Sequence, residues 1–450
     1  MKTIQTKQLK TTIQMTTATT EKMTFTDEGF QSLLSSITEP AWLTDQRKSA
    51  WNKFNDLPWP SNKDEEWMRT DIRLFKLDKF ALGGGTAKSD SENVLADGVE
   101  VAASLKFQNG QCTVGQPLDQ KWIDKGVIFG NLAELANEHP ELIQKHLNKL
   151  VDPNIDRFSA LHAATWTSGT FLYVPRNVVI EQPFHTSAVM GDAGCDFGHT
   201  LVVIEEGGEA TLLAESASDS PESTGLHCGG IEVYVADRAN LRYVNLQDWS
   251  QKVWHFAHQK STVGRDANLQ WTVGALGSRL AKVNQHVDLT GEGAHSHVNG
   301  VMFTENKQHL SYHTLQRHVA PHCVSDFLYK AALQDSSRTV WRGMIAVDKD
   351  AQKTDGFQRN DNLLLSPKAR ADSIPGLEIL ADDVRCTHGS TSGRVDEELI
   401  FYAMARGFTR KEAIRAIVIG FFQQVFDRVT IESVREALGD AIARRVREYE

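Results

Sequence analysis

A short pattern that returns at nearly constant intervals constrains the fold of this chain more than any other feature of its sequence. From about residue 160 onward, short runs of strand-forming residues alternate with turns rich in Gly, Asp and Asn. Four alanines each follow a Gly or charged turn residue and precede a strand run, and they are separated by 29, 28 and 27 residues. They are Ala210, Ala239, Ala267 and Ala294. Such a period is typical of stacked β-coils, each of which buries its face against the next.

The strand runs themselves support a solenoid over the main alternative. They fall at residues 171–174, 178–180, 201–204, 231–235, 241–246 and 269–273. In an ordinary antiparallel sandwich, strands recur at shorter spacing and without this register. We therefore predict a mainly β protein whose core is a β-solenoid.

The sequence on both sides of the strand-rich part predicts helices. Residues from about 27 to 80 have helical character, and so do residues 131–149, with an interruption at Pro140. After Gly407, apolar residues recur at i, i+3, i+4 and i+7, which places them on one face of a helix. This stripe comprises Ile414, Ile417, Val418, Phe421, Phe422, Val425 and Phe426. It can pack inside its own domain or bind a partner, and the spacing favours neither.

These patterns divide the chain into four parts. Residues 1–22 are predicted to be a disordered tail or an extension, and residues 23–155 an N-terminal helical domain. The solenoid core is expected over 156–375, continuing to about 395, and a C-terminal helical domain over 396–450.

Composition excludes several functional classes. The formal net charge of −10 argues against a protein that binds duplex nucleic acid. No apolar run approaches the roughly 20 residues that a membrane-spanning helix needs. The five cysteines are odd in number, scattered and without a C-x-x-C pair, which argues against a secreted disulfide framework or a self-contained metal cluster. With no secretory signal in the first 22 residues, we expect a cytoplasmic protein that binds neither nucleic acid nor membrane.

Histidine is the conspicuous residue type, with sixteen in all and seven between residues 286 and 322. His295 and His297 would lie on the same face of a strand, and imidazole is a ligand for zinc or ferrous iron. However, the four-residue intervals in this region suit ligands on a helix, whereas the region is predicted to form strands and turns. Structural roles are therefore favoured over a metal site for each of these histidines.

A second group of reactive residues is the C-x-H pair Cys386 and His388. In an extended segment the two side chains project to the same side, where the imidazole can lower the thiol pKa and both can bind a soft metal. Nucleophilic catalysis would also require an orienting carboxylate or amide and an oxyanion donor, and no such residues can be assigned. We assign no catalytic residues and predict that the chain is not an enzyme. A carbohydrate-active β-helix enzyme is disfavoured, because no aspartate pair recurs at successive coils and no secretory signal is present.

Several longer motifs resemble one protein family. VNGVMF (from Val298), HLSYHTLQRHVAPHCVSDFLYKAAL (from His309), GMIAVDKDAQKTDGFQRNDNLLLS (from Gly343) and IPGLEILADDVRCTHGSTSGRVDEELIFYAMARG (from Ile374) resemble the shared core of the SufB/SufD family. LPWPSNKDEEWMRTDI (from Leu57) resembles the amino-terminal signature found on its SufD side. The resemblance runs from about residue 57 to about 430.

Two details favour the SufD branch of this family. The run from Cys386 to Thr391 is similar to the SufD form C-x-H-G-A-T, with Ser390 in place of the usual Ala. The segment Gln358-Arg359-Asn360-Asp361-Asn362 lacks the cysteine that the corresponding SufB stretch contains.

The resemblance implies a fold and a role. The fold would be a right-handed parallel β-helix flanked by N- and C-terminal helical domains. The role would be that of a non-enzymatic scaffold subunit for iron–sulfur cluster assembly, which pairs with a SufB-like subunit and binds a SufC-like ABC ATPase. The contact with the ATPase would be the C-terminal helical stripe that begins at Ile414, with its neighbours. No cofactor would be bound stably, but iron or a nascent cluster would be held transiently at the SufB–SufD interface, with His388 as a ligand and Cys386 beside it. The alternatives are a purely structural subunit and a homodimeric scaffold.

Overall fold

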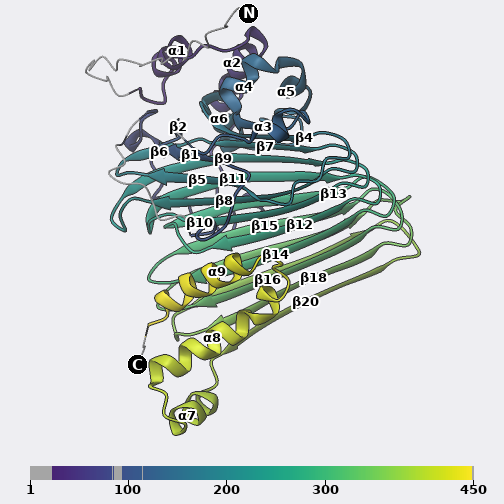
Figure 1. Cartoon of the computed structure of the whole chain (residues 1–450). Helices are drawn as coiled ribbons and strands as arrows, with labels where there is room; N and C mark the ends of the chain where they lie inside the picture. Colours follow the sequence, from purple (N-terminus) through teal and green to yellow (C-terminus); the bar gives the residue numbers. More distant parts are fainter. Residues whose placement is uncertain (1–22, 84, 86–93, 114, 448–450) are drawn as a thin grey trace, which may run out of the picture.

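Two long, mostly parallel β-sheets form the body of the molecule (Figure 1). The computed structural model describes residues 23–83, 85, 94–113 and 115–447. The first sheet contains, in spatial order, β2 (Gln111–Thr113), β1 (Ala103–Gln108), β5 (Phe184–Met190), β8 (Glu209–Ser218), β10 (Asn240–Asp248), β12 (Asn268–Ala275), β14 (His295–Thr304), β16 (Val324–Leu333), β18 (Asp355–Leu364) and β20 (Arg385–Arg394). The second contains β3 (Ile128–Asn131), β4 (Gly169–Val174), β7 (His199–Ile204), β9 (Thr224–Val235), β11 (Lys252–Val263), β13 (Leu280–Leu289), β15 (His309–His318), β17 (Arg338–Val347) and β19 (Arg370–Ile379), with β6 (Gly194–Asp196) pairing with β9.

The chain alternates between the two sheets, so that each coil adds one strand to each of them. Neighbouring coils pair in parallel, for example β10 with β12 and β11 with β13. Antiparallel pairs between strands occur in the described residues only at one end, where β1 meets β2 and β3 meets β4. The predicted mainly β solenoid with helices at both ends is therefore confirmed.

One turn of most coils has the same backbone conformation, and this explains the sequence period. The last residue of each of these turns has a positive φ, as in Arg238 (58°), Asp266 (53°) and Gly293 (68°). The carbonyl of the next residue accepts a backbone hydrogen bond from the coil that follows. This residue is Val178 in the first such turn and a small residue in the turns after it. These small residues form a ladder through the stack: Gly208, Ala239, Ala267, Ala294, Cys323 and Thr354.

The ladder corrects one part of the sequence pattern. Ala239, Ala267 and Ala294 occupy equivalent positions, but Ala210 does not, because it pairs in register with Leu241 on the next coil. Gly208 takes the ladder position in that coil, and Cys323 takes it after Ala294. Cys323 is completely buried, and its thiol donates to the carbonyl of Gly291 at 3.2 Å, so it has a packing role.

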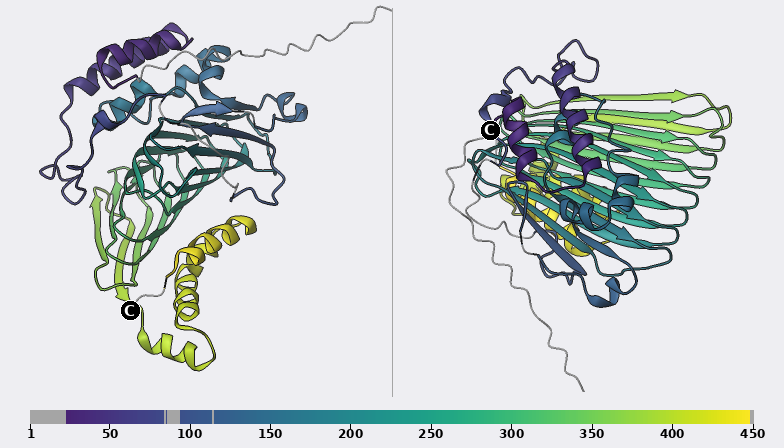
Figure 2. Two further views of the ribbon diagram at one scale, coloured as in Figure 1. Left: turned by 90° about the vertical axis from the view of Figure 1, so that its left-hand side faces the viewer. Right: turned by 90° about the horizontal axis from the view of Figure 1, so that it is seen from above.

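The helices cover the outer faces of the sheets. Those before the solenoid are α1 (Asp27–Ser36), α2 (Ala41–Asp56), the 3-10 turn η1 (Leu77–Lys79), α3 (Gln120–Ile123), α4 (Leu132–Glu138), α5 (Pro140–His146) and α6 (Arg157–Thr165). Those after it are α7 (Glu397–Ala405), α8 (Arg410–Phe426) and α9 (Glu432–Arg445). Figure 2 shows the two groups on opposite sides of the solenoid.

Three hydrophobic clusters follow from this layering. The first lies inside the solenoid, between the two sheets. The second joins α2, α4 and α6 to the outer face of the second sheet, and the third joins α8 and α9 to the outer face of the first sheet. The two groups of helices therefore pack in different clusters, although Leu95 of the N-terminal part is buried in the third cluster with α8 and α9.

Some local predictions are confirmed and others are wrong. The helical pattern over 131–149 forms α4 and α5, with Pro140 as the first residue of α5, where its missing N–H costs no helical hydrogen bond. The helix expected to reach residue 80 ends at Asp56, and the following residues form turns. The run 178–180 forms only an isolated bridge, between Val179 and Glu209. The predicted tail, residues 1–22, lies outside the described residues.

None of the helices in the described part of the chain is both long enough and apolar enough to cross a membrane.

The ladder leads to a prediction about stability. Ala267 is completely buried between Ala239 and Ala294 of the neighbouring coils, so Ala267→Leu would force the coils apart. We expect this change to lower the free energy of unfolding by about 1–3 kcal/mol, measured by urea denaturation. Ala41→Leu, at an exposed alanine, is the control and should change it by less than about 0.5 kcal/mol. Equal effects of the two changes would contradict the ladder.

Candidate functional site

The two ends of the solenoid differ in whether their outermost strands are covered. At the N-terminal end, the short antiparallel strands β2 and β3 close the two sheets, with helices nearby. At the C-terminal end, β19 pairs only with β17 and β20 only with β18 among the described residues, so each leaves one edge unpaired there. Most residues of these last two strands are exposed or half-buried. Unpaired strand edges bind other strands readily, and native proteins usually cover or blunt them.

Apolar residues at this end lack the next coil that would cover them. Leu377 and Ile379 of β19 lie in register with Ile345 and Val347 of β17, which are almost completely buried. In the last coil, however, Leu377 and Ile379 are 37% and 38% exposed, and Leu380 is 63% exposed. The interior of the solenoid therefore continues to an open end, and exposed apolar surface of this kind is typical of an interface.

Cys386 and His388 both lie at this open end, on β20. Cys386 is in register with Gly356, and His388 with Gln358, whose side chain reaches across the interior to carbonyls of β17 and β19. Because stacked parallel strands orient register partners alike, both predicted residues face the inner side of the last coil. Cys386 is half-buried and His388 is exposed.

The pKa of the Cys386 thiol differs from the sequence-based expectation. Burial raises its pKa above the usual value, and the nearby Asp355 carboxylate adds to this effect. A neighbouring imidazole was expected to lower it. The thiol is therefore protonated at neutral pH, and a metal would have to displace the proton to bind sulfur.

A polar layer lies further along the last coil, beneath Ser390 and Ser392 of β20, and was not predicted as part of a site. Asn362 Nδ2 donates to Ser373 Oγ at 3.1 Å across the interior and to Ser392 Oγ of β20 at 3.2 Å. Ser373 also donates to Asn360. The run of polar residues from Gln358 to Asn362, visible in the sequence, was the signal that an ordinary apolar interior ends here.

The open end offers few metal ligands of its own. Among the described residues, no group of three or more His, Cys, Asp or Glu side chains is placed to hold a metal ion as the structure stands. Cys386 and His388 together supply at most two ligands, whereas iron–sulfur clusters are held by about four. Any cluster held here would need ligands from another molecule.

A chain of polar contacts connects β20 to the C-terminal helices. Lys330 Nζ donates to the carbonyl of Phe421 in α8 at 3.0 Å and lies 3.7 Å from the Asp361 carboxylate. Thr391 of β20 donates to the same carboxylate at 2.6 Å. Asp361 is buried, so these contacts fix the position of β20 relative to α8.

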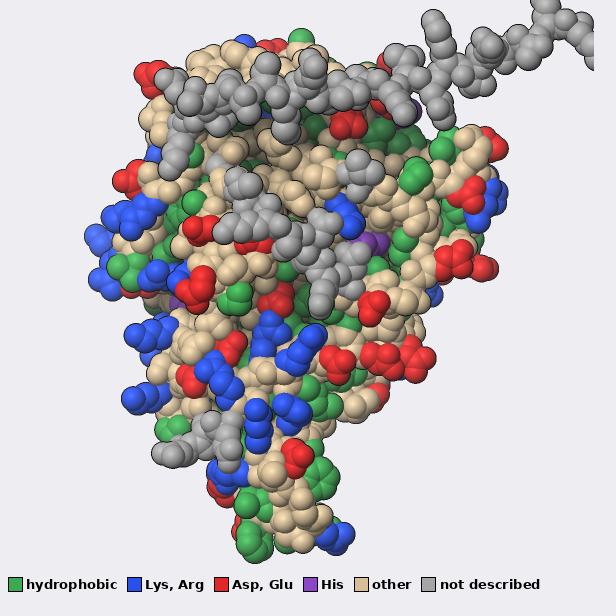
Figure 3. Space-filling model, turned by 60° about the vertical axis from the view of Figure 1, so that its left-hand side comes forward, with side chains coloured by type: hydrophobic (Ala, Val, Ile, Leu, Met, Phe, Trp, Pro, Cys, Tyr) green, Lys and Arg blue, Asp and Glu red, His purple; other side chains and the backbone are tan. Residues whose placement is uncertain are grey.

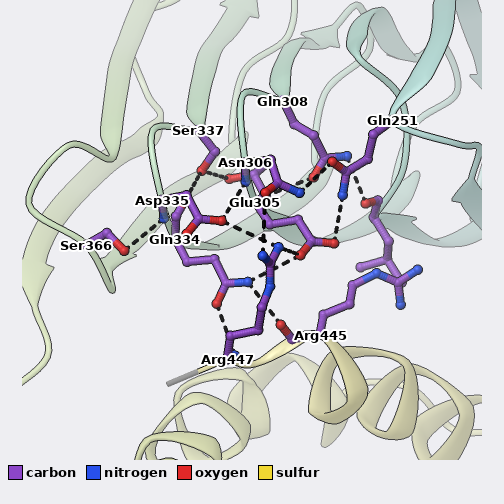
Figure 4. A network of polar contacts seen from close by, with 12 residues as sticks. Gln251, Glu305, Asn306, Gln308, Gln334, Asp335, Ser337, Ser366, Arg445 and Arg447 are labelled. Carbon is purple, nitrogen blue, oxygen red and sulfur yellow. Dashed lines mark hydrogen bonds and ion pairs between the residues drawn. The ribbon is translucent and has the colours of Figure 1, made fainter. Parts of the chain in front are cut away.

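A second polar network fastens the end of α9 to turns of the solenoid (Figure 4). Arg445 donates to both oxygens of Asp248 at 2.5 Å, and its carbonyl accepts from Gln334 at 3.0 Å. Arg447 pairs with Glu305. The C-terminal helices are therefore attached by charged contacts as well as by their apolar face.

The helical stripe predicted to contact a partner packs mostly against the chain's own sheet. Five of its seven residues are buried in the cluster with the first sheet, and Ile417 and Phe421 are half-buried. The buried five are Ile414, Val418, Phe422, Val425 and Phe426. Of the two roles left open by the sequence, packing is the one that these five residues have here.

The apolar surface that this domain exposes lies on and beside α7. Figure 3 shows hydrophobic side chains at the lower tip of the molecule, where α7 lies. Phe401 is 74% exposed. The other exposed apolar residues of this segment are Leu399, Tyr402, Met404 and Phe408. No periodicity signal identified this surface, because it follows from where α7 sits relative to the solenoid.

The histidines between residues 286 and 322 occupy separate environments. His295 and His297 lie on the same outer face of β14, as predicted. His318 instead points into the interior, where its Nε2 forms a hydrogen bond of 2.8 Å with Ser325 Oγ. His322 is an exposed turn residue with a φ of 60°. His313 contacts the N-terminal segment instead.

That segment, residues 61–70, carries the acidic part of the motif that begins at Leu57, and it lies over the second sheet. The Glu66 carboxylate bonds His313 at 2.5 Å and lies 3.1 Å from Arg342 and 3.9 Å from Lys282. It thereby spans β13, β15 and β17. Burial lowers the pKa of Lys282 to about 7 and that of His313 to about 4, so the imidazole is neutral at pH 7.

Comparisons with known proteins identify what this chain resembles. Residues 186–421 match the family model of the SufBD core domain of SUF-system iron–sulfur cluster assembly, and residues 28–185 match the SufBD protein N-terminal region. The iron–sulfur cluster assembly protein SufD of Bacillus subtilis is 29% identical over 433 residues, which covers 95% of this chain and 99% of that protein. SufBD family proteins of Staphylococcus saprophyticus and Staphylococcus epidermidis are 24% and 27% identical over 421 residues, covering 88% of this chain and 87% of each relative.

The buried lysine leads to a prediction about pH. Lys282 is 2% exposed, and its folded pKa of about 7 lies below the unfolded value of about 10.4. The unfolded chain therefore binds more protons between these values, and stability should rise as the pH rises from about 7 to about 10. We expect Lys282→Met to raise the free energy of unfolding at pH 7 by about 1–3 kcal/mol, and by much less at pH 10, in urea titrations.

The exposed Lys252 provides the matched control, and Lys252→Met should change stability little at either pH. A gain from Lys282→Met that is the same at pH 7 and pH 10 would contradict the assigned cause.

Proposed function

Because this chain belongs to the SufBD family of iron–sulfur cluster assembly proteins, we propose that it is a scaffold subunit whose open solenoid end pairs with a SufB-like subunit. The observation that carries the proposal is the uncovered last coil. Two strand edges, exposed apolar residues and the C-x-H pair all lie there. A second solenoid presenting its own open end would pair both edges and cover Leu377 and Ile379.

The same geometry supports a shared site for iron or a nascent cluster. His388 is exposed on the inner side of β20, and Cys386 is next to it on the same face. The chain supplies at most these two ligands at its open end, so the remaining ligands would come from the SufB-like partner. His388 would bind iron through a neutral imidazole nitrogen, and the site would form only when the two subunits are together.

We place the contact for a SufC-like ABC ATPase on the exposed apolar residues of α7. Phe401 and Tyr402 are more than half exposed, on a helix that lies away from the sheets. The stripe on α8 supports this surface from below by packing against the first sheet. Movement of α7 and α8 driven by ATP would reach β20 through Lys330 and Asp361, which join α8 to the last coil.

The proposed ligand role of His388 can be tested directly. In the anaerobically purified complex, His388→Ala should reduce iron and cluster content about tenfold or more while leaving the subunits associated. His388 is exposed, so the change should not unfold the chain. His295→Ala, at another exposed histidine, should leave the iron content unchanged. Normal cluster loading with His388→Ala would show that the subunit has only a structural role.

The α7 surface makes a separate prediction. Replacing Phe401 and Tyr402 together with serine should weaken binding of the ATPase about tenfold or more, measured by calorimetry. Leu74→Ser is the control, because Leu74 is 70% exposed on the N-terminal side of the molecule. If the α7 double variant binds the ATPase as the unchanged chain does, the contact lies elsewhere.

A homodimeric scaffold uses the same open end, paired with a second copy of this chain. Affinity purification from the cells of origin distinguishes the two assemblies. Recovery of a SufB-like protein and an ATPase in fixed ratio supports the heterodimer, whereas recovery of this chain alone as a dimer favours the homodimer.

A further inference from the structure

A polar cavity lies inside the solenoid, near its N-terminal end and several coils away from the C-x-H pair. Its volume is about 100 Å³, and it lies between the two sheets. Among its lining residues are Asp196, His227, His255, Trp249 and Gln259. An interior cavity of this kind is usually either apolar and empty or polar and occupied.

Three of the lining residues form a continuous row across neighbouring strands. Asp196 of β6 is in register with His227 of β9, and His227 is in register with His255 of β11. The two imidazole rings are stacked, with their centroids 4.5 Å apart and their planes inclined by 18°. The row therefore presents one carboxylate and two imidazoles to the same space.

Several polar atoms of the lining residues have no hydrogen-bond partner among the residues that the structure describes. The unpaired atoms are His227 Nδ1, His255 Nδ1, Trp249 Nε1 and Gln259 Oε1. His255, Trp249 and Gln259 are each at least 95% buried, so bulk water does not satisfy them. Unpaired buried polar atoms are rare in folded proteins, and here the four residues that carry them all line one cavity.

The charge in the cavity is also unbalanced. Asp196 is only 4% exposed and accepts a hydrogen bond from the Gly198 N–H at 2.7 Å. Within the described part of the chain it forms no ion pair with a lysine or arginine. A buried carboxylate without a cation is costly, and an imidazole nitrogen that carries no proton has a lone pair for a cation.

The backbone is shaped to keep this space open. A Cβ at Gly229 would lie 2.5 Å from Cε1 of His227, so only glycine leaves room for the ring. Gly110 and Ser168 line both this cavity and a surface hollow of about 460 Å³ beside Cys112, and the Ser168 hydroxyl donates to the Gly110 carbonyl. These two residues form a wall that the cavity and the surface hollow share.

We propose that this cavity binds a divalent transition-metal ion, with Asp196, His227 and His255 as its ligands. Two imidazoles and one carboxylate are a ligand set that suits zinc and ferrous iron and leaves coordination positions open. The ligand atoms do not converge on one point in the structure. Two nitrogens bound to one ion lie at most about 4.2 Å apart, so metal binding would require both rings and the Asp196 carboxylate to rotate toward one point. This site is separate from the C-x-H pair and does not depend on the proposed pairing of subunits.

The first test uses zinc alone and the full-length chain, freed of metal by a chelator. We expect it to bind one zinc ion per chain that Asp196→Asn binds at least tenfold more weakly, measured by elemental analysis after equilibrium dialysis. Asparagine keeps the acceptor for Gly198, so this variant retains the local fold. His255→Gln should have the same effect. His295→Ala, at an exposed histidine outside the cavity, should bind zinc as the unchanged chain does.

The second test locates the metal in the unchanged chain. A crystal of the unchanged chain grown with Co²⁺ should show an anomalous peak between the His227 and His255 rings. The metal should also raise the melting temperature of the unchanged chain more than that of Asp196→Asn. Equal zinc binding by all variants, or anomalous peaks only at other histidines, would overturn the proposal.

Discussion

The structure depends on the repeated hydrogen-bonded stacking of one coil on the next. In most coils a turn residue of positive φ is followed by a residue whose carbonyl accepts a backbone hydrogen bond from the next coil. In the middle of the stack these ladder positions hold small side chains, and Cys323 is one of them. The stacking sets the register of every strand, so side chains on equivalent positions form continuous rows through the molecule.

Those rows determine where chemistry can occur. In the middle of the solenoid a row is covered above and below, and its members are buried. At the open end the same rows reach the surface. Gln358 and His388 are neighbours in one such row, and the Gln358 amide is buried whereas the His388 imidazole on the last coil is exposed. Near the other end, the row of Asp196, His227 and His255 places three metal-binding groups side by side in a cavity. The two places share an origin in the stacking but not a function.

The segments before and after the solenoid pack across several of its coils. The acidic segment around Glu66 lies across three strands of the second sheet, while α8 and α9 cover the first. A one-dimensional stack has no contacts between distant coils of its own, so such segments join coils that would otherwise interact only with their neighbours. Lys330 and Asp361 show the same principle on a small scale, because they connect α8 to the last coil.

The sequence by itself determined the solenoid, the flanking helices and the family, because period, turn residues and motifs are local and recur along the chain. It also identified Cys386 and His388 as a pair on one face of a strand, since alternation along a strand is a local property. The sequence could not show that Ala210 lies outside the ladder. Ala210 is two residues beyond the ladder position of its coil, and a shift of two residues along a strand keeps the side-chain direction and changes only the register. The sequence also could not tell that the α8 stripe is buried while Phe401 is exposed, that burial raises the pKa of Cys386, or that Asp196 lies beside two histidines from later coils. Exposure, pKa and proximity across coils depend on which surfaces the folded chain covers, and only the tertiary structure decides that.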